Sequence, residues 1–206
     1  MSLALVFALL LGGDPASERS EEEVQALVAA VRGGDRDAAQ SLYVLYAARL
    51  FRAVRPLCFS DAEAEDMVQD TFVKALTALD RYQPRPGIRF VAWLSTVALN
   101  TTRKRARRRR FEIPTEPKER SAGSEADTVA EADRKRLRHA LLEALERLPE
   151  RDRQVIALRY GAELSAPEVA EIVGVSAASV RKICERRRAE LLARLRQRAH
   201  PLEETA

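Results

Sequence analysis

Helix signals run through this chain from end to end, and no stretch has the alternating apolar and polar pattern of a β-strand. Apolar side chains recur at three- and four-residue spacings, for example at Leu42, Tyr46 and Leu50. Ser60 and Ser165 each stand three residues before a glutamate, the order of a capping box at a helix start. Aromatic residues make up only 5% of the chain, which leaves little material for strands. The sequence therefore predicts an all-α fold.

Charge and helix breakers divide the 206 residues into regions. Residues 1–110 carry 17 basic and 13 acidic side chains, residues 111–130 carry 2 and 5, and residues 131–206 carry 16 and 13. The acidic middle stretch also concentrates Pro, Gly and Ser, a composition typical of linkers. We therefore expect two small helical domains, 21–110 and 131–200, joined by a flexible linker at 111–130 and preceded by an N-terminal extension, 1–20.

The N-terminal extension contains one apolar run, from Leu3 to Leu11. The run is too short to span a bilayer, which needs about 20 residues. No basic residue precedes it, and Gly12-Gly13-Asp14 is a poor cleavage site, so a signal peptide is disfavoured. Two interpretations stay open: an extension that packs on the protein, or a start codon placed too far upstream. We expect a soluble, cytoplasmic protein with no stable membrane insertion.

Metal and catalytic sites are disfavoured by the residues that such sites need. Cys58 and Cys184 stand far apart, there is no CxxC pair, and the chain has only two histidines. No Ser/His/Asp set and no glycine-rich phosphate loop stands out. We therefore expect a protein that is not an enzyme and that needs neither a metal nor a cofactor.

The most specific local pattern is a helix–turn–helix in the second domain. Ala170 supplies a small residue where two helices cross, and Gly174 supplies the turn. Val175 and Val180 fill the angle between the helices, and Ser176 caps the second one. That helix is predicted to present Ser176, Ala177, Ser179, Arg181 and Lys182 outward, as a recognition helix does in the major groove. Residues 181–198 hold eight basic side chains against two acidic ones, which favours DNA binding over a merely solvated helical hairpin.

A second pattern is the run from Arg103 to Arg110, in which seven of eight residues are basic. It continues a helix that carries Phe90 and Trp93, and it follows an irregular loop with Pro84, Pro86 and Gly87. Arginines on phosphates beside planar rings make a platform for unpaired bases. For Phe90 and Trp93 taken alone, packing in the core is the favoured interpretation.

A third pattern is an acidic helical face. Asp66, Gln69 and Asp70 fall at positions i, i+3 and i+4 of the helix that begins at Ser60. The opposite face is predicted to bury Val68, Phe72, Leu76 and Leu79. Such a face is often only solvated, but an acidic stripe does not help a protein bind DNA. It is therefore a candidate surface for docking another protein.

Together these motifs resemble a known family. Residues 60–72 are similar to the helix by which bacterial sigma factors bind core RNA polymerase, and residues 90–100 with the following arginines resemble their promoter-melting segment. Residues 148–160 with the helix–turn–helix resemble their −35-reading domain. Because only these two domains are present, the chain resembles the extracytoplasmic-function (ECF) subgroup of the sigma-70 family. The resemblance covers roughly residues 24–195.

The resemblance implies roles for three sets of residues. Those expected to bind core polymerase are Asp66, Gln69 and Asp70. Those expected at the −10 element, where the loop from Tyr82 to Arg89 captures a flipped base, are Tyr82, Arg85, Arg89, Phe90, Trp93, Asn100, Arg103, Arg107 and Arg108. Those expected at the −35 element are Ser176, Ser179, Arg181, Lys182, Arg186 and Arg188.

The function that the resemblance implies is transcription initiation. The partners would be core RNA polymerase, promoter DNA and an anti-sigma factor. A free-standing helix–turn–helix regulator of duplex DNA is the main alternative, but it gives the acidic face and the aromatic loop no task. A basic RNA-binding or nucleoid protein is a further alternative, and it does not explain a defined recognition helix.

Overall fold

The computed structural model describes residues 6, 7, 10, 19–111 and 129–199. Within these residues the fold is built from helices, and the sole β-type contact is an isolated bridge between Arg85 and Ile88. The α-helices are α2 (Glu21–Arg32), α3 (Arg36–Val54), α4 (Asp61–Thr77), α5 (Phe90–Phe111), α6 (Val129–Glu146), α7 (Glu150–Ile156), α8 (Ala166–Val173) and α9 (Ala177–Ala199). The all-α prediction is confirmed. Most of the predicted linker, residues 112–128, lies outside the described residues.

Short helices of other types complete these elements. The 3₁₀ helix η1 (Arg55–Leu57) follows α3, and a second one, η2 (Leu79–Arg81), follows α4. Helix α7 continues directly into a π-helical turn, η3 (Ala157–Gly161). We call residues 19–111, with α2 to α5, the N-lobe, and residues 129–199, with α6 to α9, the C-lobe.

Side-chain caps fix where the predicted helices begin. At α8, the Ser165 hydroxyl accepts a hydrogen bond from the Glu168 amide, and the Glu168 carboxylate accepts one from the Ser165 amide at 2.7 Å. At α4, the Ser60 hydroxyl accepts from the Glu63 amide at 3.1 Å, as predicted. The Glu63 carboxylate, however, accepts from the Phe59 amide rather than from Ser60. Only half of the predicted box at Ser60 is therefore formed.

The buried face of α4 is close to the predicted one. Val68, Phe72 and Leu79 are buried, as expected. Leu76 was predicted to be buried, and this is wrong, because 38% of it is exposed. The buried stripe passes from Phe72 through Ala75 to Leu79, so Leu76 falls at its edge beside the exposed Val73.

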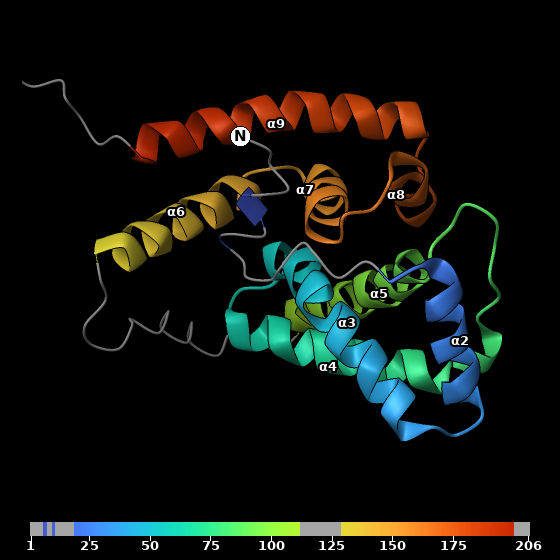
Figure 1. The fold of residues 1–206 in the computed structure, drawn as a ribbon. Coiled ribbons are helices and arrows are strands. Elements are labelled where there is room, and N and C mark those ends of the chain that lie inside the picture. Colours follow the sequence, from blue (N-terminus) through green and yellow to red (C-terminus); the bar gives the residue numbers. More distant parts are fainter. Residues whose placement is uncertain (1–5, 8–9, 11–18, 112–128, 200–206) are drawn as a thin grey trace, which may run out of the picture.

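The C-lobe is arranged under its last helix. Figure 1 shows α9 lying along one side of the lobe, over α6, α7 and α8. Helix α9 packs against all three of them. Buried side chains such as Leu141, Ile156, Val180 and Leu191 form the apolar centre of this arrangement.

The two lobes pack directly on each other. The middle of this contact is formed by α3 of the N-lobe and η3 of the C-lobe. At Gly161 the two backbones meet so closely that an added Cβ atom would lie 2.5 Å from the carbonyl oxygen of Arg52. Only glycine fits at such a separation. The apolar cores of the lobes therefore merge into one buried cluster.

The described residues of the apolar run in the N-terminal extension are buried. Val6, Phe7 and Leu10 are at most 6% exposed, and the Phe7 ring lies 6.3 Å from the ring of Tyr160 in the C-lobe. At these residues the apolar run packs on the protein. Among the described residues, no helix is long and apolar enough to cross a membrane.

Candidate nucleic-acid interface

The acidic face predicted on α4 is present as one exposed surface. Asp66, Gln69 and Asp70 are all exposed on α4, while Met67 and Val68 face the core. Val73, one turn beyond Gln69, is 66% exposed and extends this face with an apolar side chain. Sequence reasoning did not single out Val73, although its spacing from Asp66 and Gln69 places it on the same side of the helix.

Aromatic rings from the predicted −10 loop and from α5 form a cluster. Tyr82 stacks edge-on against Phe90 at 5.1 Å and lies 5.0 Å from Trp93. Tyr82 and Phe90 are buried, and the Tyr82 hydroxyl accepts a hydrogen bond from Gln25. The favoured interpretation for Phe90, core packing, is thus what the structure shows. Trp93 is only half-buried, so one part of its ring is open.

A pocket of about 200 Å³ opens beside this ring cluster. Trp93 and Tyr82 form its aromatic wall, and its remaining lining comes from Arg81, Gln83, Arg85 and Ile88. Pro84, Pro86 and Gly87 keep this stretch irregular, and Gly87 has a φ of +76°. A planar group bordered by arginines is the chemistry that holds an unpaired base and its phosphate. Arg81 lies outside the predicted loop and Ile88 lies within it, and neither was singled out, because a pocket's lining depends on how the loop closes.

In the predicted basic stretch of α5, some side chains are exposed and others bind groups of the protein itself. Asn100, Arg107 and Arg108 are exposed. Arg103 instead donates a hydrogen bond of 2.7 Å to the side-chain oxygen of Gln154 in α7. Arg109 pairs with Glu63 and lies over the Phe59 ring, 4.1 Å from its centre. The arginine run is therefore partly a structural element and partly an exposed basic surface.

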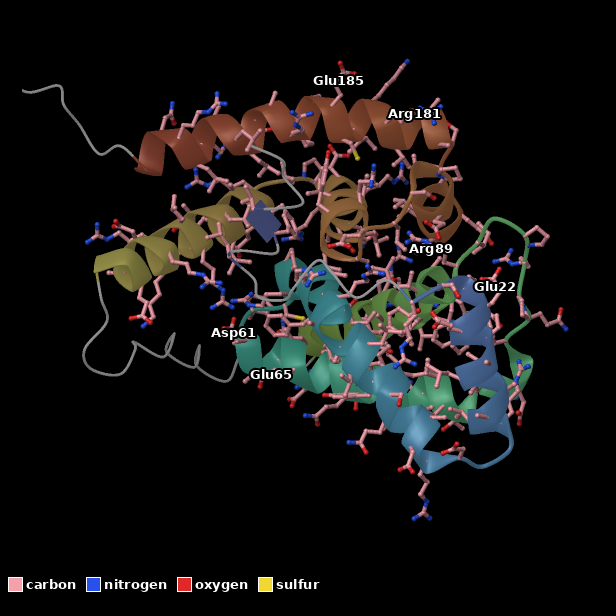
Figure 2. All side chains as sticks on the ribbon, viewed as in Figure 1. Glu22, Asp61, Glu65, Arg89, Arg181 and Glu185 are labelled. Atoms are coloured by element: carbon pink, nitrogen blue, oxygen red, sulfur yellow. The ribbon has the colours of Figure 1, made fainter. Side chains whose placement is uncertain are left out.

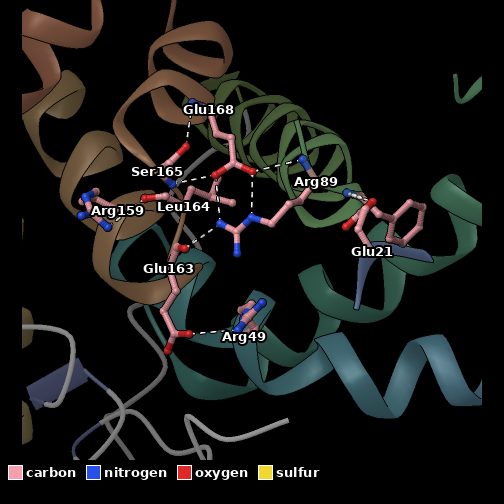
Figure 3. A network of polar contacts seen from close by, with 9 residues as sticks. Glu21, Arg49, Arg89, Arg159, Glu163, Leu164, Ser165 and Glu168 are labelled. Atoms are coloured by element: carbon pink, nitrogen blue, oxygen red, sulfur yellow. Dashed lines mark hydrogen bonds and ion pairs between the residues drawn. The ribbon is translucent and has the colours of Figure 1, made fainter. Parts of the chain in front are cut away.

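Arg89 lies between the lobes and is held by the C-lobe (Figures 2 and 3). Its guanidinium donates to both carboxylate oxygens of Glu168, at 3.0 and 2.9 Å, and to the backbone carbonyl of Glu163. Its backbone amide also donates to Glu168. On the N-lobe side, the amide of the next residue, Phe90, donates to the carboxylate of Glu21.

The surroundings of Glu168 stabilise its charged form. Burial alone would raise the pKa of this carboxyl, which is 1% exposed. The hydrogen bonds from Arg89 and Ser165 outweigh burial and lower its pKa from 4.5 to about 2. The difference corresponds to roughly 3 kcal/mol of folded-state stability. Because the folded-state pKa is the lower one, this stability is present above pH 4.5 and is lost as the pH falls toward 2.

The helix–turn–helix has the predicted geometry. Gly174 ends α8 in the left-handed conformation, with φ of +74°, and its amide donates to the carbonyl of Ala170 at 2.9 Å. The Ser176 hydroxyl accepts from the Ser179 amide at 3.1 Å and so caps α9. Val180 is fully buried at the crossing of the two helices.

Most of the predicted −35 residues lie on the open side of α9. Arg181, Lys182, Arg186 and Arg188 are exposed, and Ser176 is exposed at the cap. Ser179 is partly covered and shares a hydrogen bond with Ser176. Figure 2 labels Arg181 near the end of α9 that lies beside α8.

Asp152, which the sequence analysis did not single out, holds α9 through ion pairs. Asp152 of α7 is nearly buried and accepts from Arg186 at 3.0 Å and from Arg187 at 2.7 Å. Arg187 also pairs with Glu190 along α9. Asp152 therefore fixes α9 on the lobe and orients Arg186. The sequence around Asp152 did not predict these ion pairs, because its two arginine partners lie 34 and 35 residues away.

Two known families match parts of this chain. Residues 42–112 match the family described as sigma-70 region 2. Residues 138–191 match the one described as sigma-70, region 4.

Individual proteins are similar over most of the chain. The RNA polymerase sigma factor CarQ of Myxococcus xanthus is 30% identical over 150 residues, which cover 73% of this chain and 84% of CarQ. The ECF RNA polymerase sigma factor SigD of Mycobacterium tuberculosis is 31% identical, over 81% of each protein. The ECF sigma factor SigW of Bacillus subtilis is 27% identical, over 85% of this chain and 98% of SigW.

Solved structures have the same fold. The structure of CnrH in complex with the cytosolic domain of CnrY is 29% identical, with a TM-score of 0.58 over 83% of this chain and 96% of that one. The sigma factor RpoE, solved with the anti-sigma factor NepR from Bartonella quintana, gives a TM-score of 0.57 at 23% identity, over 79% of this chain and 98% of that one. With both sigma-70 regions present in order, this chain belongs to the ECF subgroup of the sigma-70 family and is an RNA polymerase sigma factor that acts in promoter recognition and transcription initiation.

Proposed function

We propose that this sigma factor performs its tasks with three surfaces and without catalysis of its own. The exposed face of α4 docks on core RNA polymerase through Asp66, Gln69 and Asp70. The ring-lined pocket and α5 hold the opened −10 strand. Helix α9 reads the −35 element in the major groove. The proposed domains are 21–110 for polymerase and −10 binding and 131–200 for −35 binding.

The pocket beside Trp93 carries the −10 part of the proposal. A base that leaves the duplex loses stacking, at a cost of a few kcal/mol. The open part of the Trp93 ring offers it a new stacking partner, and Arg85 at the rim offers a cation for its phosphate. Tyr82 and Phe90 do not contact the base in this proposal. They pack against the Trp93 ring and hold it in place. Farther along α5, Asn100, Arg107 and Arg108 follow the strand.

The exposed charges on α9 carry the −35 part. Arg181 lies on the first turns of the helix, where recognition helices meet base edges. An arginine there can bond a guanine through two parallel hydrogen bonds. Arg186 and Arg188 lie farther along and suit phosphates of the backbone. Ser176, Ser179 and Lys182 complete the surface near the turn.

The partners follow from the same relatives. CnrH was solved with the cytosolic domain of CnrY, and RpoE with the anti-sigma factor NepR. We extend this to an anti-sigma factor for the present protein and place its activity in the cytoplasm, where RNA polymerase works.

The first prediction concerns docking. The double variant Asp66→Arg/Asp70→Arg should lose co-purification with core polymerase in the absence of DNA, because it reverses the charge of the α4 face. Both side chains are exposed, so the helicity should not change. The control, Asp80→Arg/Glu146→Arg, reverses two exposed carboxylates on other elements and should bind core polymerase normally. Normal binding by the α4 variant would remove Asp66 and Asp70 from the surface that docks on core polymerase.

The second prediction concerns −35 reading. Arg181→Ala should reduce discrimination between −35 sequences by about 1–3 kcal/mol, the value of one bidentate base contact. Arg194 is the matched control, since it lies near the end of α9 and pairs with Glu190 at 3.0 Å. Arg194→Ala should at most weaken binding evenly. Equal losses for every sequence in both variants would assign Arg181 to phosphate alone.

The third prediction concerns phosphate binding by α5. Each phosphate neutralised on single-stranded DNA adds about −0.7 to the slope of log affinity against log salt. The variant Arg107→Gln/Arg108→Gln should therefore flatten the slope for −10 strand binding by about 1.4 without altering base preference. The pair Arg134→Gln/Arg136→Gln removes two exposed charges of α6 and should leave the slope alone. A slope that is the same in both double variants and in the wild type would show that α5 does not follow the strand.

A further inference from the structure

We propose that Glu185 of α9 is a specificity-determining residue for the −35 element, and that its carboxylate selects a cytosine by accepting a hydrogen bond from the cytosine amino group. This inference rests on the proposed function of α9 in the major groove. To the arginine contact proposed at Arg181 it adds a second, acidic base contact on the same helix.

Glu185 lies on the same side of α9 as Arg181, one helical turn farther along (Figure 2). Residues four positions apart on a helix are neighbours on its surface. Both side chains are exposed, and both line one hollow of about 600 Å³ beside α9, together with Arg188. In recognition helices the side chains that meet base edges recur at such three- and four-residue spacings. Glu185 therefore has the position of a base-contacting residue.

The Glu185 carboxylate forms neither an ion pair nor a hydrogen bond within the part of the chain that the structure describes. Two other carboxylates at this helix, Asp152 and Glu190, are each bound by two arginines of α9. The charges of those two groups are used inside the protein. The charge of Glu185 is available to a ligand.

A free carboxylate on a DNA-binding surface is unfavourable unless a base donates a hydrogen bond to it, because the DNA phosphates repel it. In the major groove the donors are the amino groups of cytosine and adenine. Adenine also presents N7, an acceptor, next to its amino group, and the N7 lone pair repels a carboxylate. Cytosine has no acceptor there, and its amino group is the usual base partner of a glutamate. Glu185 therefore favours cytosine over the other three bases.

The spacing of the two residues on the helix predicts the spacing of their bases on the DNA. Four residues rise about 6 Å along an α-helix, and successive base pairs lie about 3.4 Å apart. Arg181 and Glu185 should therefore reach base pairs one or two steps apart. The −35 element should contain a guanine, the base that an arginine binds through two hydrogen bonds, and a cytosine one or two steps from it on either strand.

The base preference of the holoenzyme tests this inference. The full-length wild type and its variants are each assembled with core polymerase on a mapped promoter whose −35 region is randomised, and the bound DNA is sequenced. The variants are Glu185→Gln, Glu185→Ala and Arg181→Ala. The matched control, Glu190→Gln, removes a carboxylate of the same helix that is already paired inside the protein. Circular dichroism checks that each variant keeps its helices.

One −35 position should depend on Glu185. There the wild type should prefer cytosine by at least about five-fold, the lower end of the range for a specific base contact. Glu185→Gln should change this preference to adenine, because a glutamine amide donates to adenine N7 and accepts from its amino group. Glu185→Ala should lose the preference, and Glu190→Gln should keep the wild-type preference at every position.

The outcomes separate this inference from the proposed function. Unchanged preferences in both Glu185 variants, with relaxed discrimination in Arg181→Ala, would overturn the role of Glu185 and leave −35 reading by α9 intact. Unchanged preferences in all three variants would overturn both. A wild-type preference for another base at the position that responds to Glu185→Ala would overturn the cytosine contact, as would the same response in Glu190→Gln.

Discussion

The contact between Glu168 and Arg89 connects more of this molecule than any other single interaction that the structure describes. Glu168 completes the cap of α8, so it sets where the first helix of the helix–turn–helix begins. Through Arg89 it also holds the start of α5, the helix that carries Trp93. The carboxylate is buried and keeps its charge because donors from both lobes surround it. One side chain therefore couples the C-lobe to the N-lobe.

In the proposed −10 site, the structure gives different positions to rings that the sequence alone treats alike. Tyr82, Phe90 and Trp93 are all aromatic and close in sequence, yet only Trp93 keeps part of its ring open. The two buried rings and the Gln25 hydrogen bond fix that ring in one orientation. A fixed ring loses little freedom when a base stacks on it, so the proposed site would bind an extruded base more tightly than a mobile ring would.

The sequence predicted those features that depend on residues close to one another in the chain. The caps at Ser60, Ser165 and Ser176, the turn at Gly174 and the acidic face of α4 follow from spacings of a few residues. The lobe contact could not be predicted in this way, because Arg89 and Glu168 are 79 residues apart. The same limit applies to Asp152 and to the lining of the pocket. Leu76 shows a subtler limit, since a helical stripe has an edge and periodicity does not say where the edge falls.

The central claim is that this protein opens promoter DNA when it is bound to core polymerase. The direct measurement is permanganate reactivity of thymines in the −10 region of a mapped promoter, with wild-type holoenzyme. The account predicts reactive thymines with the wild type, and a loss of reactivity when Gln83, Pro84 and Arg85 are replaced by Gly and Ser while the DNA stays bound. Thymines that remain unreactive on DNA bound by wild-type holoenzyme would contradict it.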